Sequence, residues 1–141
     1  MSIEAGVVID NKGEPIFWHV PGDRTGGSLP DSSDLWTFLW EHREVISGFA
    51  HSHPGSGEPY YSSTDKSTFR AIEAGLGRRL DWWIVSSDSL VLYRWDEGKQ
   101  TYLSCFRSWG KTAKHRRASE PAWARELRDY SHYEEVEDVD R

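Results

Sequence analysis

Residues 44–54, EVISGFAHSHP, form an apolar run that ends in two histidines, and SSTD follows at residues 62–65 after a glycine-containing loop. The apolar run (residues 44–50) predicts a buried strand, and the serines of the second stretch predict the start of a helix. Because side chains alternate along a strand, His51 and His53 are expected to point to the same face. A carboxylate at the start of the helix, Asp65, can fold back toward them.

Two neutral imidazoles and one carboxylate are a usual set of protein ligands for a catalytic zinc ion, and they leave the fourth tetrahedral position open for water. A structural zinc site is instead closed by four protein ligands, usually including cysteine. The chain has one cysteine, Cys105, far along the sequence. The sequence therefore predicts a Zn²⁺ ion bound by His51, His53 and Asp65.

Together with Glu4 in the segment IEAGVV (residues 3–8), these residues resemble the signature of the JAMM/MPN (JAB-domain, Mov34-like) zinc metalloprotease family. That signature is a glutamate on an early strand, then His-x-His-Pro, then Ser-x-x-Asp. The resemblance runs from residue 1 to about residue 95, and the compact prokaryotic or viral members are the more similar. The loop at residues 55–61 is one residue longer than the family pattern, and a helix that often precedes the first strand of the family is missing.

The resemblance implies that Glu4 is the general base and that Ser62 stabilises the oxyanion beside the metal. It further implies a zinc-dependent metallopeptidase or isopeptidase that hydrolyses an amide bond of a protein or peptide. The substrate expected from the family is a ubiquitin-like or sulfur-carrier protein, or a component of a phage assembly. The alternative is a non-catalytic MPN-type protein-binding module, although such members have usually lost the zinc ligands that this chain keeps.

Each of these residues also has an ordinary structural explanation. Ser62 can cap a helix, and Asp65 in the first turn favours the helix dipole. Glu4 needs no role if it is exposed on a strand. Glu14 is the rival base, but it lies beside a predicted turn, at the opposite end of the strand from Glu4. The remaining side chains with reactive groups are interpreted as structural or without a catalytic role: His19, His42 and Cys105.

The composition limits the class of protein. A chain of 141 residues with eight tryptophans is expected to form a single compact core. Its formal net charge of -6 gives no basic surface for nucleic acid. No apolar run approaches the roughly 18 residues that a membrane span needs. One cysteine excludes an internal disulfide framework, so we expect a cytoplasmic protein with no membrane or nucleic-acid partner.

The predicted elements alternate between strands and helices, which favours an α/β (α+β) fold. By resemblance, this fold is a curved, mostly antiparallel sheet flanked by helices, a sandwich like that of JAMM proteins and cytidine deaminases. Strands are predicted at residues 4–10, 15–20, 44–50, 80–86, 90–95 and 100–107, and helices after residues 30–34, at 62–76 and at 120–130.

The composition changes after Trp109, which divides the chain into two parts. Residues 1–110 are predicted to form the JAMM/MPN-type domain. Residues 111–141 are predicted to contain a basic linker (residues 111–117), a short helix and an acidic tail (residues 134–141).

Overall fold

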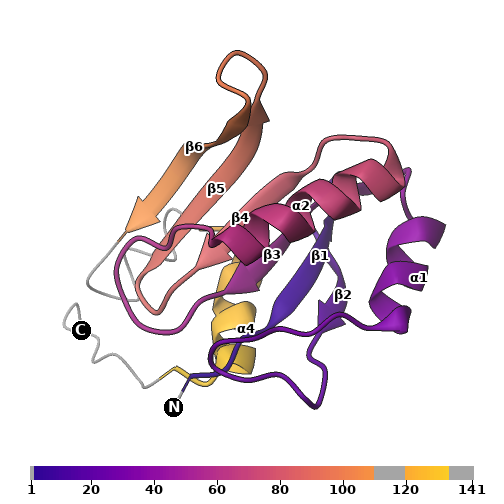
Figure 1. The fold of residues 1–141 in the computed structure, drawn as a ribbon. Helices are drawn as coiled ribbons and strands as arrows, with labels where there is room; N and C mark the ends of the chain where they lie inside the picture. Colours follow the sequence, from indigo (N-terminus) through magenta and orange to yellow (C-terminus); the bar gives the residue numbers. More distant parts are fainter. Residues whose placement is uncertain (1, 110–119, 134–141) are drawn as a thin grey trace.

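The computed structural model describes residues 2–109 and 120–133, so the predicted basic linker and acidic tail lie outside the described residues. Figure 1 shows the arrangement of the elements along the chain. They are β1 (Gly6–Asp10), β2 (Pro15–His19), α1 (Ser33–Glu41), β3 (Ile46–Ser52), α2 (Ser63–Leu76), β4 (Asp81–Val85), β5 (Ser89–Asp96), β6 (Thr101–Trp109) and α4 (Ala122–Ser131).

The strands form one six-stranded sheet in the order β2-β1-β3-β4-β5-β6. Every neighbouring pair is antiparallel except β3 and β4, which run parallel and are connected through α2. A parallel pair needs such a crossover, whereas antiparallel neighbours can be joined by short turns. The predicted α+β class and the mostly antiparallel sheet are confirmed, and the sheet is open, with β2 and β6 at its edges.

Helices cover both faces of the sheet, because the strand side chains alternate between two apolar clusters. Along β1, Val8 packs with the residues of α1 and α2, while Val7 and Ile9 pack with those of α4. In Figure 1, α2 crosses the sheet on one side and α4 lies behind it on the other. Among the described residues, no helix has the length and apolar character needed to cross a membrane.

Side-chain and glycine caps explain where the helices begin and end. Ser32 caps α1, and its side chain accepts a hydrogen bond from the Leu35 N–H. Ser62 caps α2, which ends at Gly77 in the left-handed conformation that glycine adopts without strain. Pro121 is the N-cap of α4, so this helix starts slightly later than the sequence predicted.

A buried carboxylate fixes the C-terminal half of α2 to the sheet. Glu73 accepts hydrogen bonds from the Tyr102 hydroxyl at 2.5 Å, from Trp82 Nε1 at 2.9 Å and from the Leu80 N–H at 3.0 Å. A buried carboxylate without these donors would reduce the free energy of unfolding, so the contacts hold the helix in one position. The N-terminal half of the same helix, which carries Asp65, is positioned with it.

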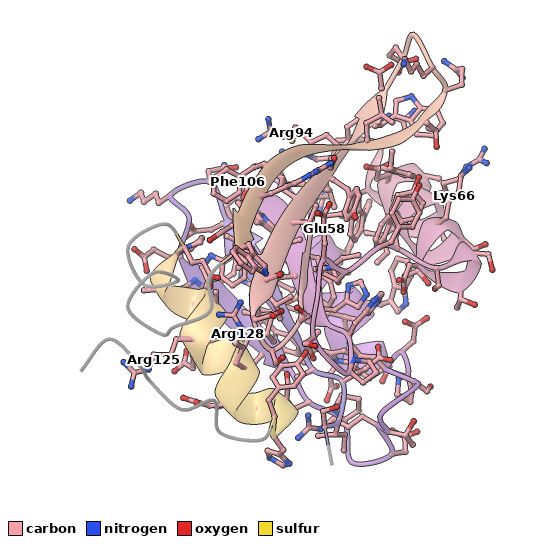
Figure 2. All side chains as sticks on the ribbon, turned by 90° about the vertical axis from the view of Figure 1, so that its left-hand side faces the viewer. Glu58, Lys66, Arg94, Phe106, Arg125 and Arg128 are labelled. Atoms are coloured by element: carbon pink, nitrogen blue, oxygen red, sulfur yellow. The ribbon has the colours of Figure 1, made fainter. Side chains whose placement is uncertain are left out.

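Arg128 attaches α4 to the sheet. Its guanidinium donates hydrogen bonds to the backbone oxygens of Ser86 and Ser89 and forms a two-point ion pair with Glu120. Figure 2 shows Arg128 on the side of α4 that faces the sheet and Arg125 on its outer side. Helix α4, which follows the undescribed residues 110–119, therefore packs as part of the same core as the sheet.

Candidate metal centre

The two histidines are placed by the central strand β3. This strand ends at Ser52, later than the predicted range of 44–50, so His51 belongs to the strand itself and is paired with Ile84 of β4. The His53 N–H donates to the Val85 oxygen at 2.8 Å, which extends the pairing one residue beyond the strand. The extended backbone points both imidazoles to the same face, as the sequence predicted, and their Nε2 atoms lie 3.0 Å apart.

Asp65 reaches the histidines from the first turn of α2. The N-cap is a capping box, because Ser62 Oγ accepts from the Asp65 N–H at 3.0 Å and Asp65 Oδ2 accepts from the Ser62 N–H at 2.9 Å. The same carboxylate lies 2.9 Å from His53 Nε2 and 3.3 Å from His51 Nε2. The helix cap therefore fixes the carboxylate that completes the cluster, so the two explanations of Ser62 and Asp65 are compatible.

The three groups are close enough together to hold one metal ion. Bonds of 2.0–2.2 Å at tetrahedral angles would separate neighbouring ligand atoms by about 3.3 Å. The Nε2 atoms of His51 and His53 lie 3.0 Å apart, Asp65 Oδ2 lies 2.9 Å from His53 Nε2, and Asp65 Oδ1 lies 3.3 Å from His51 Nε2. One ligand atom from each residue lies within 4.8 Å of the other two. The group can therefore hold a metal ion.

Charge and burial shift the pKa values of the two carboxylates in opposite directions. Burial alone would raise the pKa of Asp65, but hydrogen bonds with His51 and His53 outweigh it and keep the pKa well below its usual range. Burial raises the pKa of Glu4, and the nearby His51 and His53 only partly oppose the rise. Asp65 is therefore suited to stay ionised as a ligand, whereas Glu4 is suited to exchange a proton.

Glu4 lies just before β1 rather than on it, because the strand begins at Gly6. Its backbone is held by the loop after β2: the Glu4 N–H donates to the Thr25 oxygen at 2.9 Å, and Arg24 Nη1 donates to the Glu4 oxygen at 3.0 Å. The residue lines the same cavity as the three ligand residues. Glu14, the rival base, lies in the turn between β1 and β2 and does not line that cavity.

The cavity has a volume of about 430 Å³ and lies between α2 and the loop that precedes α1. Both predicted catalytic residues, Glu4 and Ser62, line it together with the three ligand residues. Its remaining wall contains residues that the sequence analysis did not identify, because they come from four separate elements and the loop at residues 26–31. The apolar ones are Leu29, Leu35, Phe49, Phe69, Ile72 and Trp82.

Three side chains connect the back of the site to the C-terminal segment: Ser52, Ser131 and Tyr133. The sequence analysis identified none of them. Ser52, between the two histidines, accepts a hydrogen bond from the Ala5 N–H at 2.9 Å and another from Ser131 Oγ at 2.7 Å. The Tyr133 hydroxyl donates to the backbone oxygen of His53. Burial raises the pKa of Tyr133, so the hydroxyl stays protonated as a donor. The sequence did contain one signal for this contact, the serine between the two predicted histidine ligands. Because side chains alternate along a strand, this serine must face away from the metal.

Tyr133→Phe is expected to weaken metal binding about 10-fold without unfolding the protein, as removal of outer contacts commonly does. The substitution removes only the hydroxyl that fixes the backbone of His53. Titration of the metal-free protein with zinc would measure the change. Tyr130→Phe is the matched control, because the Tyr130 ring packs against Trp18 with centroids 5.0 Å apart and does not line the cavity, so this variant should bind zinc like the unmodified chain. Equal affinities in both variants would contradict the positioning role.

The groups interpreted from the sequence as structural or without a catalytic role, His42, Cys105 and His19, are not part of the candidate ligand group. His42 stacks on Phe38 at 3.9 Å, and Cys105 is exposed with a pKa raised by partial burial of its thiol. His19 is buried, and its Nε2 lies 2.7 Å from the Pro30 oxygen. Burial lowers the pKa of His19, which favours the neutral ring. It also lines the cavity, which the sequence did not indicate.

Comparison of the chain with models of known protein families gave no match, and comparison with curated proteins gave no relative. The arrangement of His51, His53, Asp65, Glu4 and Ser62 is therefore the basis for assigning a function.

Proposed function

We propose that this chain is a zinc-dependent metallopeptidase or isopeptidase of the JAMM/MPN type that hydrolyses an amide bond. One observation carries the proposal: a cluster of two histidines and one aspartate that could hold a metal ion shares a cavity with a half-buried carboxylate, Glu4, whose pKa is raised by burial. A closed structural site would not need that carboxylate or an open position. The helices on both faces of the sheet support the finer fold assignment, a sandwich like that of JAMM proteins and cytidine deaminases.

Amide hydrolysis adds the oxygen of water to the carbonyl carbon and breaks the carbon–nitrogen bond. A bound zinc ion would supply the reaction with a water molecule whose pKa is lowered from 15.7 toward about 7. Glu4 takes the proton of this water and passes it to the leaving nitrogen, so that no proton is lost or gained overall. Ser62 Oγ already accepts a hydrogen bond from the Asp65 N–H, which leaves its own proton free to stabilise the developing oxyanion.

The proposed substrate is a protein or peptide, including one that carries a ubiquitin-like domain. The test uses a linear peptide fused to a ubiquitin-like domain and a peptide linked to a lysine side chain of that domain. We expect the purified protein to bind one zinc ion per chain and to release an amine from at least one substrate, with activity lost to a chelator and restored by zinc. Zinc binding without any amide cleavage would favour the alternative, a non-catalytic binding module.

Ser62→Ala is expected to retain zinc but to lower turnover by roughly 10²- to 10³-fold, the loss typical of one oxyanion donor. Loss of the helix cap would also cost about 1 kcal/mol of folding stability, too little to unfold a typical domain. Ser63→Ala is the matched control, because Ser63 is exposed in the same turn and does not line the cavity. Loss of zinc from Ser62→Ala would limit the serine to its capping role.

A further inference from the structure

The open rim of the cavity consists of exposed residues from the two segments that enclose it. Gly27, Ser28 and Asp31 are exposed in the loop before α1, and Ser62 and Thr64 are exposed at the start of α2. A substrate can reach these residues without entering the packed core. We propose that Asp31 selects a substrate with a lysine or arginine side chain beside the cleaved amide. The inference rests on the proposed function and names the substrate class.

The lining of the cavity is acidic. Glu4, Asp31 and Asp65 line it, and no lysine or arginine among residues 2–109 and 120–133 does. At the metal end, the charges of Asp65 and Glu4 are offset by a divalent ion, the largest local charge in such a site. The negative charge of Asp31 is then the one that remains at the rim. A rim with this charge attracts a cationic side chain and repels an anionic one.

Asp31 is available for such a contact. In the part of the chain that the structure describes, the arginine side chains form ion pairs with carboxylates other than Asp31: Glu58, Glu73, Asp81, Glu97 and Glu120. Asp31 interacts electrostatically with His19, but burial still lowers the pKa of that ring and favours its neutral form. The charge of Asp31 can therefore pair with an ammonium or guanidinium group that arrives from solvent.

Asp31 also has an ordinary structural explanation, which a second aspartate shares. Asp31 directly precedes Ser32, the N-cap of α1, where a negative charge favours the helix dipole. Asp34 lies in the first turn of the same helix and is likewise exposed, but it does not line the cavity. A role in helix stability should therefore belong to both residues, whereas a role in substrate selection should belong to Asp31 alone.

Two zinc-binding ligands can test the role of Asp31 without any turnover. Nα-acetyl-lysine hydroxamate and Nα-acetyl-norleucine hydroxamate share the metal-binding group and the straight carbon chain, and only the lysine compound ends in an ammonium group. At low ionic strength, we expect the zinc-loaded protein to bind the lysine compound about 2- to 5-fold more tightly by calorimetry, the range for an exposed ion pair. This gain should shrink at high salt, because salt screens exposed charges.

Three variants separate substrate selection from helix stability. Asp31→Asn should remove the gain while keeping the affinity for the norleucine compound, and Asp34→Asn should preserve both. Asp31→Lys reverses the charge at the rim, so it should bind the α-hydroxamate of Nα-acetyl-glutamate more tightly than the lysine compound. A change in helix stability would not reverse the preference between these two ligands.

The outcomes distinguish this inference from the proposed function. Equal affinities of the lysine and norleucine compounds in the unmodified protein would overturn the role of Asp31 but leave the metallopeptidase proposal standing. A gain that persists in Asp31→Asn, or that Asp34→Asn removes equally, would also overturn it, because another charge would be responsible. Failure of every hydroxamate to bind the zinc-loaded chain would reject both proposals. A second measurement, on peptide substrates, should show faster cleavage with lysine or arginine than with norleucine or glutamate beside the amide, and the opposite order would overturn the inference.

Discussion

Replacing His51 or His53 by alanine is expected to abolish stoichiometric zinc binding at neutral pH. Each imidazole is one of the three candidate ligands found among the described residues, so its removal leaves two. Four-ligand zinc sites gain roughly 10–16 kcal/mol, about a quarter of it from each ligand. The loss of one ligand should therefore weaken binding by roughly 10²- to 10³-fold.

Metal content after dialysis, measured by elemental analysis, would test this expectation. His42→Ala is the matched control, because His42 caps the end of α1 and does not line the cavity. This variant should retain zinc in the same amount as the unmodified protein. If the unmodified protein bound no transition metal after zinc was supplied, the metallopeptidase proposal would be rejected at its first step.

Glu4→Gln is expected to lower turnover by roughly 10²- to 10⁴-fold, the contribution of a positioned general base. The substitution keeps the shape of the side chain and removes the proton acceptor, so folding and zinc content should not change. The sign of the pH dependence follows from the raised pKa of Glu4. Because only the ionised carboxylate accepts a proton, activity in the unmodified protein should fall as the pH drops through that pKa, above the usual range for glutamate.

Glu14→Gln should be assayed beside it and should retain nearly full activity. Glu14 lies in the turn after β1, where its backbone N–H donates to Asp10 Oδ1 at 2.9 Å. An inactive Glu14→Gln with an active Glu4→Gln would mean that the residue assigned as the base is wrong. Full activity in both variants would show that hydrolysis proceeds without a carboxylate from the start of the chain.

The metal ligands could be predicted from the sequence because each depends on local structure. Two histidines two residues apart on an extended segment must share a face, and a serine three residues before Asp65 predicts the capping box that holds the carboxylate. The order of strands and helices follows equally from local periodicity. These features need no knowledge of which distant segments come together.

The rest of the site depends on contacts between distant segments, which periodicity does not report. The cavity wall combines Leu35, Phe49, Phe69 and Trp82 from four elements, and each residue alone is an ordinary core position. Tyr133 follows a helix that the sequence separates from the rest by a change in composition, yet it contacts the backbone of His53. The position of Glu4 before β1 depends on hydrogen bonds to the loop near Thr25, which the sequence did not predict.

The contacts behind the candidate metal centre can form only late in the synthesis of the chain. The Ile3 N–H donates to the Ser131 oxygen, Ser131 Oγ donates to Ser52, and Tyr133 donates to the backbone of His53. The ribosome makes both histidines and Asp65 long before it makes these partners. A nascent chain can therefore contain all three candidate ligands before the contacts of Ile3, Ser52 and His53 with the C-terminal segment exist.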